Sequence, residues 1–195
     1  MHKKILFLLS ISVSLFSKNI SIITGSTREG RSSLKVANAI KNLAPKDKHN
    51  FEIVDIKEYD LPFLSEAATP SSTQKRNNPN VAKWSKKVSG SDAFIIIVPE
   101  YNRSYPAVLK NAIDVLFHEW KDKPVLFIGY SGGKSGGSYA IKHFEDISNE
   151  LKLKMQKDNV KIPAIWKAFN SDNSFVDKAI EKNIISAINN LINRV

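Results

Sequence analysis

Short apolar runs and stretches of helical periodicity follow each other in turn along the chain. Strand-like apolar runs cover Asn19–Thr24, Phe51–Ile56, Ala93–Val98, Pro124–Tyr130 and, more weakly, Lys157–Ile162. Apolar residues recur at helical spacing in Ser33–Leu43, Val81–Val88, Pro106–Phe117, Ser138–Leu151 and Phe175–Ile192. The polar, proline-containing stretch Tyr59–Pro79 predicts a long loop.

This alternation of strand and helix, repeated five times, predicts an α/β fold with a doubly wound parallel sheet. The run Ala93–Val98 is apolar throughout, as expected of a strand that is buried on both faces. No change in composition marks a second domain, so we expect one domain over residues 18–195. Ligands of such sheets bind outside the carboxyl ends of the strands, so the loops after the apolar runs are the candidate site.

The N-terminal segment Met1–Ser17 differs from the rest of the chain. Two lysines precede the apolar run Ile5–Phe16, an arrangement typical of a secretory signal. The run is too short to span a bilayer, which needs about 20 apolar residues. Residues 1–17 are therefore interpreted as a signal peptide or as an N-terminal extension that precedes the domain.

Composition and charge narrow the possible functions. The 195 residues include no cysteine, which excludes disulfides, thiolate metal sites and a cysteine nucleophile. The formal net charge of +10 is compatible with a nucleic-acid partner, an anionic ligand or a lysine-rich surface. The lysines are spread along every helix and loop instead of clustering with aromatic residues, so we expect neither a nucleic-acid partner nor a membrane partner.

The loop GSTREGRSS, residues 25–33, follows the first strand and opens the first helix. Its two arginines match the geometry of a phosphate, and the helix N-terminus adds free N–H groups. The loop nearly matches a nucleotide-triphosphatase P-loop, but Arg31 stands where that motif needs lysine. No apolar run ends in the aspartate that would hold magnesium, so a phosphate site of another kind is favoured over a triphosphatase.

Two further loops follow apolar runs. PEYNRSYPAVLKNAID, residues 99–114, places an aromatic ring and an amide at the mouth of the sheet before running into a strongly amphipathic helix. Its plainer interpretation is a strand-to-helix connection in which Ser104 caps the helix. GYSGGKSGG, residues 129–137, has five glycines that allow a backbone to approach a ligand closely, or that simply make a flexible loop.

Together these three strings resemble the NADPH-dependent FMN reductase family, in the branch of small quinone, chromate and azo-dye reductases. The similarity covers about Lys18–Val195, and the string at residues 99–114 is the most specific part. The resemblance implies a flavodoxin-like three-layer sandwich with a five-stranded parallel sheet of order 2-1-3-4-5. It also implies a homodimer or homotetramer and a cytoplasmic location, with export through the N-terminal segment as the alternative.

The resemblance also implies roles for particular residues. The phosphate of FMN would be bound by Ser26, Arg28, Arg31, Ser32 and Ser33. The ribityl chain and the isoalloxazine ring would contact Pro99, Glu100, Tyr101 and Asn102, while the far side of the ring would meet Ser131, Gly132 and Gly133. Arg103 and Tyr105 depart from the small or aliphatic residues common in relatives, which leaves the choice of substrate open.

The implied activity is transfer of hydride from NADPH, or NADH, through FMN to a small acceptor such as a quinone, a flavin, an azo compound or a metal oxyanion. The hydride chemistry belongs to the cofactor, so no catalytic side chain and no metal are expected. The four scattered histidines are interpreted as structural or solvated. The alternative is a flavodoxin-type electron carrier that binds FMN but reduces no small molecule; such carriers are usually acidic, whereas this chain is basic.

Overall fold

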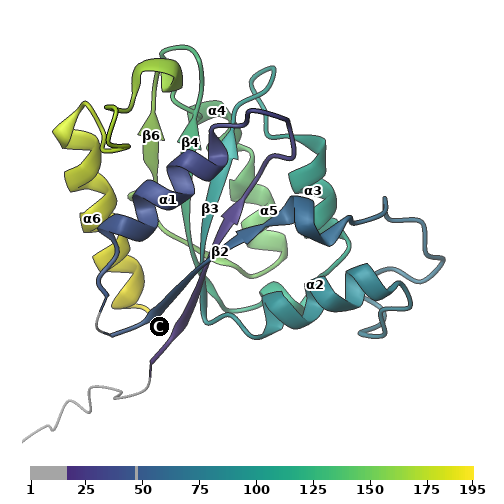
Figure 1. Ribbon diagram of the computed structural model, residues 1–195. Helices are drawn as coiled ribbons and strands as arrows, with labels where there is room; N and C mark the ends of the chain where they lie inside the picture. Colours follow the sequence, from purple (N-terminus) through teal and green to yellow (C-terminus); the bar gives the residue numbers. More distant parts are fainter. Residues whose placement is uncertain (1–16, 47) are drawn as a thin grey trace, which may run out of the picture.

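A single parallel sheet organises the chain in the computed structural model, which describes residues 17–46 and 48–195 (Figure 1). The strands lie in the order β2-β1-β3-β4-β5, and a sixth short strand also pairs with β4. The strands are β1 (Asn19–Thr24), β2 (Asn50–Asp55), β3 (Ala93–Pro99), β4 (Pro124–Tyr130), β5 (Lys154–Met155) and β6 (Val160–Ile162). The predicted α/β class and the strand order 2-1-3-4-5 are confirmed.

Helices cover both faces of the sheet, which makes three layers (Figure 1). One face packs against α1 (Ser33–Leu43) and α6 (Lys178–Ile192). The other face packs against α2 (Pro79–Ser89), α3 (Ala107–Asp114), α4 (Ser138–Lys142) and α5 (Phe144–Glu150).

The sequence of β3 shows why the sheet needs two helical layers. All seven of its residues are buried. Ile95 and Ile97 pack into the core under α1 and α6, whereas Phe94, Ile96 and Val98 pack into the core on the opposite face. A strand with apolar side chains on both faces is stable only where both faces are covered.

The prediction of one fifth strand at Lys157–Ile162 needs correction, because two short strands, β5 and β6, share that place beside β4. The side chain of Asn159 interrupts the ladder between them. Its amide oxygen accepts from the Phe127 backbone N–H at 2.8 Å, so a side chain takes the place of a strand carbonyl.

Two predicted helices are also shorter than expected. The helix predicted at Ser138–Leu151 is divided at His143, whose ring hydrogen-bonds to Ser104 Oγ at 2.9 Å. The helix predicted from Phe175 begins at Lys178, because Phe175 pairs with Phe169 in an isolated bridge and Asp177 caps the helix. The predicted Ser104 cap of α3 is wrong as well: the N-cap residue is Pro106.

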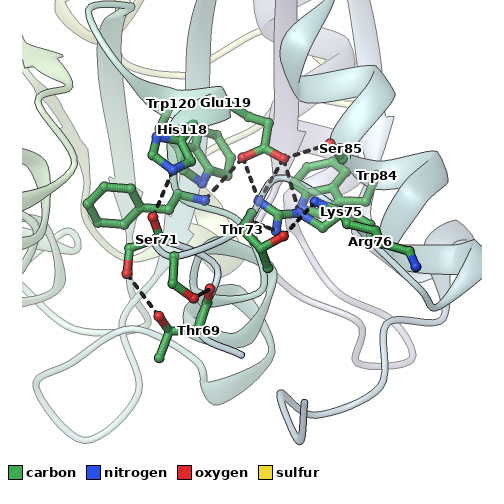
Figure 2. A network of polar contacts seen from close by, with 12 residues as sticks. Thr69, Ser71, Thr73, Lys75, Arg76, Trp84, Ser85, His118, Glu119 and Trp120 are labelled. Atoms are coloured by element: carbon green, nitrogen blue, oxygen red, sulfur yellow. Dashed lines mark hydrogen bonds and ion pairs between the residues drawn. The ribbon is translucent and has the colours of Figure 1, made fainter. Parts of the chain in front are cut away.

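The predicted loop between β2 and α2 begins after a short 3-10 helix at Ile56–Tyr59 and is held by buried polar groups (Figure 2). Arg76, near the end of the loop, donates three hydrogen bonds to the Glu119 carboxylate at 3.0–3.2 Å. Glu119 also accepts from Ser85 Oγ on α2 at 2.6 Å and from the Phe117 N–H at 3.1 Å. This network joins the loop to α2 and to the connection between α3 and β4.

Among residues 17–46 and 48–195, no helix is long and apolar enough to cross a bilayer. The signal-like segment expected at Met1–Ser17 lies, apart from Ser17 itself, outside the residues that the structure describes.

Candidate functional site

The loops at the carboxyl edge of the sheet converge on one pocket of about 370 Å³. Its walls come from four segments that are far apart in the sequence: the loop into α1, the turn after β3, the loop after β4 and the segment after β6. The lining residues are Arg28, Gly30, Arg31, Ser32, Pro99, Glu100, Tyr101, Tyr130, Ser131, Gly132, Ile165 and Trp166.

The loop between β1 and α1 supplies the cationic side of the pocket. It starts at Gly25, whose N–H donates to the Ile97 carbonyl at 2.9 Å and where a Cβ would collide with that carbonyl oxygen. Arg31 forms an ion pair with Asp55 at the end of β2, and both side chains are about nine-tenths buried. Arg31 also donates to the Arg28 carbonyl oxygen at 3.2 Å, so the loop is preorganised by its own arginine.

Two buried polar atoms of this loop have no hydrogen-bond partner among the described residues: Arg31 Nε and Ser33 Oγ. A buried polar atom without a partner costs about 1–3 kcal/mol, and ligand-binding sites are where such a cost is offset. Both atoms lie at the start of α1, where the helix dipole and free N–H groups favour an anion. The residues therefore fit an anionic group such as a phosphate.

A two-residue turn follows β3 beside the pocket. Tyr101 and Ser104 exchange backbone hydrogen bonds at 2.8 and 2.9 Å, and the residues between them, Asn102 and Arg103, have φ angles of 51° and 61°. Asparagine adopts this left-handed conformation readily, whereas arginine does so at a cost of about 1 kcal/mol. The Arg103 guanidinium lies 5.0 Å from the centre of the Tyr139 ring, a cation–π contact that offsets part of that cost.

The Glu100 side chain joins this turn to the glycine-rich loop after β4. Its Oε1 accepts from Ser135 Oγ at 2.7 Å, and its Oε2 accepts from the Tyr139 N–H at 3.2 Å. Ser135 in turn contacts Ser131 Oγ at 3.0 Å, and that oxygen accepts from the Gly136 N–H at 2.9 Å. The two loops thus form one hydrogen-bonded unit.

Two tyrosines give the pocket its aromatic character. The hydroxyl groups of Tyr101 and Ser26 are 3.1 Å apart, which fixes the Tyr101 ring against the loop between β1 and α1. Burial raises the pKa of Tyr130 to about 12, so its hydroxyl stays protonated at all physiological pH values. The pocket therefore combines cations, free donors and flat apolar surfaces, as a phosphorylated aromatic ligand requires.

Comparison with known proteins agrees with this chemistry. The family model of the NADPH-dependent FMN reductases matches residues 19–167, which contain every wall of the pocket. The chain belongs to the NADPH-dependent FMN reductase family. It is accordingly an FMN-dependent NAD(P)H oxidoreductase, and the electron-carrier alternative is not favoured.

Individual relatives of this FMN reductase are of similar size. An NAD(P)H-dependent FMN reductase of Schizosaccharomyces pombe is 33% identical over 140 residues, which are 70% of this chain and 68% of the relative. A 2-hydroxy-1,4-benzoquinone reductase of a Burkholderia species is 33% identical over 140 residues, 69% of this chain and 72% of the relative. The solved structure of FerB, a flavoenzyme NAD(P)H:(acceptor) oxidoreductase from Paracoccus denitrificans, has a TM-score of 0.74 at 25% identity, covering 90% of this chain and 96% of FerB.

The structure brings most of the site residues predicted for this reductase together. Those that line the pocket are Arg28, Arg31, Ser32, Pro99, Glu100, Tyr101, Ser131 and Gly132. Four others stand behind or beside it. Ser26 and Ser33 are buried beneath the first loop, Asn102 is at the exposed tip of its turn, and the Gly133 carbonyl accepts from the Ala164 N–H at 3.0 Å.

Sequence reasoning assigned no role in the site to Gly30, Ile165 or Trp166, and it left Tyr130 out of the site residues. Ile165 and Trp166 follow β6, the short strand that the apolar pattern indicated only weakly. The rule that ligands bind after parallel strands applies to this strand too, and a tryptophan four residues after its end was the available signal. Among the described residues, no group of three or more His, Asp or Glu side chains is placed to hold a metal ion.

Proposed function

We propose that this chain binds FMN in the 370 Å³ pocket and uses it to pass hydride from NADPH or NADH to a small quinone-type acceptor. The observation that carries the proposal is the pairing, in one pocket, of an arginine-bearing loop at a helix N-terminus with two tyrosine rings. The names of relatives, which include several quinone reductases, support the acceptor class. FMN, when bound, supplies the hydride chemistry.

The chain's own residues would bind and orient the cofactor. Arg28, Arg31 and Ser32, with Ser26 and Ser33 behind them, would hold the phosphate. The ribityl chain and the ring would meet Pro99, Glu100, Tyr101 and Asn102, and the far side of the ring would meet Ser131, Gly132 and Gly133. The network around Glu100 would keep the last two segments at a constant separation.

The test compares variants of the two arginines. Arg28→Ala should weaken FMN binding about 10- to 100-fold, the value of one to two charge-assisted contacts. Arg31→Ala should weaken it more, because it leaves the Asp55 carboxylate facing the phosphate without its partner. Lys182→Ala on α6, outside the pocket, is the control and should bind FMN as the unaltered chain does.

FMN content after purification and Kd from titration give the cofactor result, and oxidation of NADPH or NADH with a benzoquinone gives the activity. Full FMN retention by the double arginine variant would refute the phosphate assignment. A protein that retains FMN but oxidises neither NADPH nor NADH in the presence of quinones would support the electron-carrier interpretation instead.

We further propose that the chain forms a homodimer or homotetramer through the loop between β2 and α2. The Phe63 ring is 78% exposed and Leu64 is 44% exposed. Leu64 lines two cavities of about 420 and 480 Å³, and the proposed interface would place the corresponding loop of a second copy against them. Phe63→Glu should shift the mass measured by sedimentation velocity to that of a monomer, whereas Ile185→Glu, at an exposed apolar position on α6, should not.

The extent and location of the domain are proposals as well. We propose that residues 18–195 form the FMN-binding domain, that residues 1–17 precede it, and that the protein is cytoplasmic. The match of the family model from residue 19 supports the boundary. N-terminal sequencing of the native protein tests both statements, since an intact Met1 supports the cytoplasm and cleavage near Ser17 indicates export.

A further inference from the structure

Trp166 borders the pocket although no motif of the sequence assigns it a role. Its side chain is 75% exposed, while the other two tryptophans, Trp84 and Trp120, are almost fully buried. It belongs to a 3-10 helix, Ile165–Lys167, and it lines the same cavity as Arg28 and Tyr101. An indole ring so exposed beside a ligand cavity is a surface available for contact.

Backbone contacts hold this 3-10 helix against the glycine-rich loop. The Ala164 N–H donates to the Gly133 carbonyl, and the Ile165 N–H donates to the Ser131 carbonyl, both at 3.0 Å. Ala164 has a φ of 45°, a left-handed conformation that turns the chain sharply after β6. The indole is therefore presented from a backbone that two hydrogen bonds tie to the glycine-rich loop.

The position of the ring in the cavity determines what it can contact. Arg28 and Ser32 border the cavity on the phosphate side and Tyr101 borders it on the aromatic side. A molecule that contacts both Arg28 and Tyr101 occupies the cavity that Trp166 also lines. The Lys167 ammonium lies 5.3 Å from the centre of the indole, a cation–π contact.

We infer that Trp166 is an FMN-binding residue whose indole covers the bound cofactor from the segment after β6. The inference rests on the proposed function, since it assumes that FMN occupies this pocket. It adds a fourth wall to the three loops predicted from the sequence. Contact between an indole and a flat ligand contributes about tenfold or more to affinity, and it also shields the indole from solvent.

The first experiment measures Kd for FMN by titrating the full-length chain, freed of flavin, and following flavin fluorescence. Trp166→Ala should raise Kd about tenfold, and Trp166→Phe, which keeps a flat ring, should raise it about twofold to threefold. Val176→Ala is the matched control: it removes an exposed apolar side chain, 55% exposed, from the same connection between β6 and α6 but outside the pocket. Its Kd should stay within twofold of the unaltered chain.

The second experiment is hydroxyl-radical footprinting of the unaltered chain, read by peptide mass spectrometry. Oxidation of Trp166 should fall when FMN is added, whereas Trp84 and Trp120 should be protected with and without it. An unchanged Kd for Trp166→Ala, or equal oxidation of Trp166 in both states, overturns the inference. So does a variant that raises only KM for NADPH, which would place the indole against the nucleotide.

Failure of the proposed function gives a different result. If the unaltered chain does not bind FMN at all, the proposed function fails, and the inference fails with it. If the unaltered chain binds FMN and loses it on replacement of Arg28 and Arg31 but not of Trp166, the function stands and only the inference is overturned.

Discussion

Removing one partner of the ion pair between Arg76 and Glu119 should destabilise this fold by several kilocalories per mole (Figure 2). The exposed fractions of the two side chains are only 6% and 7%, so neither charge is compensated by water. Replacing Arg76 with methionine keeps the apolar stem of the side chain but leaves the Glu119 carboxylate buried without its cation. Breaking a buried pair in this way costs about 3–5 kcal/mol.

The remaining partners of Glu119 place the effect within that range. The carboxylate keeps the hydrogen bonds from Ser85 Oγ and from the Phe117 N–H, so the lower end, about 3 kcal/mol, applies. For a domain of this size that corresponds to a fall in Tm of roughly 6–12 °C. Replacing Glu119 with glutamine in the same chain removes the unpaired charge, so Arg76→Met/Glu119→Gln should lose only about 1–2 kcal/mol.

Urea unfolding followed by circular dichroism, at one protein concentration, gives the free energies of the unaltered chain, both single variants and the double variant. A coupling energy of more than about 1 kcal/mol between the two sites is expected, because the double variant should lose less than the two single variants together. An Arg76→Met variant within about 1 kcal/mol of the unaltered chain, or a double variant as unstable as Arg76→Met alone, would contradict a penalty from the unpaired Glu119 charge.

Three further outcomes follow from particular residues. Gly137→Ala should lower the free energy of unfolding by about 3 kcal/mol, because φ at this residue is 90° and an added Cβ would lie 2.5 Å from Tyr130 N. Gly132→Ala is the control: the space around Gly132 is open, so the free energy should change by less than about 1 kcal/mol in the same urea assay. Asn78→Ala should cost about 1 kcal/mol in urea unfolding, since its side chain caps α2, whereas Asn78→Asp should retain the cap. Burial acts to raise the pKa of Glu119, but hydrogen bonds from Ser85 and from backbone N–H groups, together with the Arg76 charge, lower it below 4.5. Its contribution to stability should therefore be present above pH 4.5 and be lost as the pH falls through the lowered pKa. Thermal melts across this range should show that the Tm of Glu119→Gln depends less on pH than the Tm of the unaltered chain. An identical pH dependence of the two Tm values would contradict the assignment.

The periodicity of apolar residues was sufficient to predict the class of the fold and to select the loops that line the 370 Å³ pocket. The strand β3 illustrates this, because seven consecutive buried residues admit few arrangements other than a central parallel strand. The short strands β5 and β6 were harder, since an asparagine side chain that enters the ladder leaves no trace in the apolar pattern.

The partners of individual side chains in the site could not be read from the chain. The sequence predicts Arg31 as a phosphate ligand but does not predict its ion pair with Asp55, 24 residues further along. Glu100 directs its carboxylate to Ser135, a contact between two loops that local sequence does not encode. Such contacts depend on how neighbouring strands align. The type of a residue limits which partners it can bind, but it does not determine which of them lies beside it in the fold.

The pairing of β6 with β4 has a consequence for how the protein is made. Because Val160–Ile162 and the 3-10 helix after them complete the pocket, the cavity is not enclosed until the chain has left the ribosome as far as residue 167 of 195. A nascent chain that ends after β4 has the phosphate loop and the turn but lacks one wall. FMN that enters this pocket would therefore bind late in synthesis, when the domain is nearly complete. Because FMN would bind the folded domain and not the unfolded chain, it would favour the folded form by mass action.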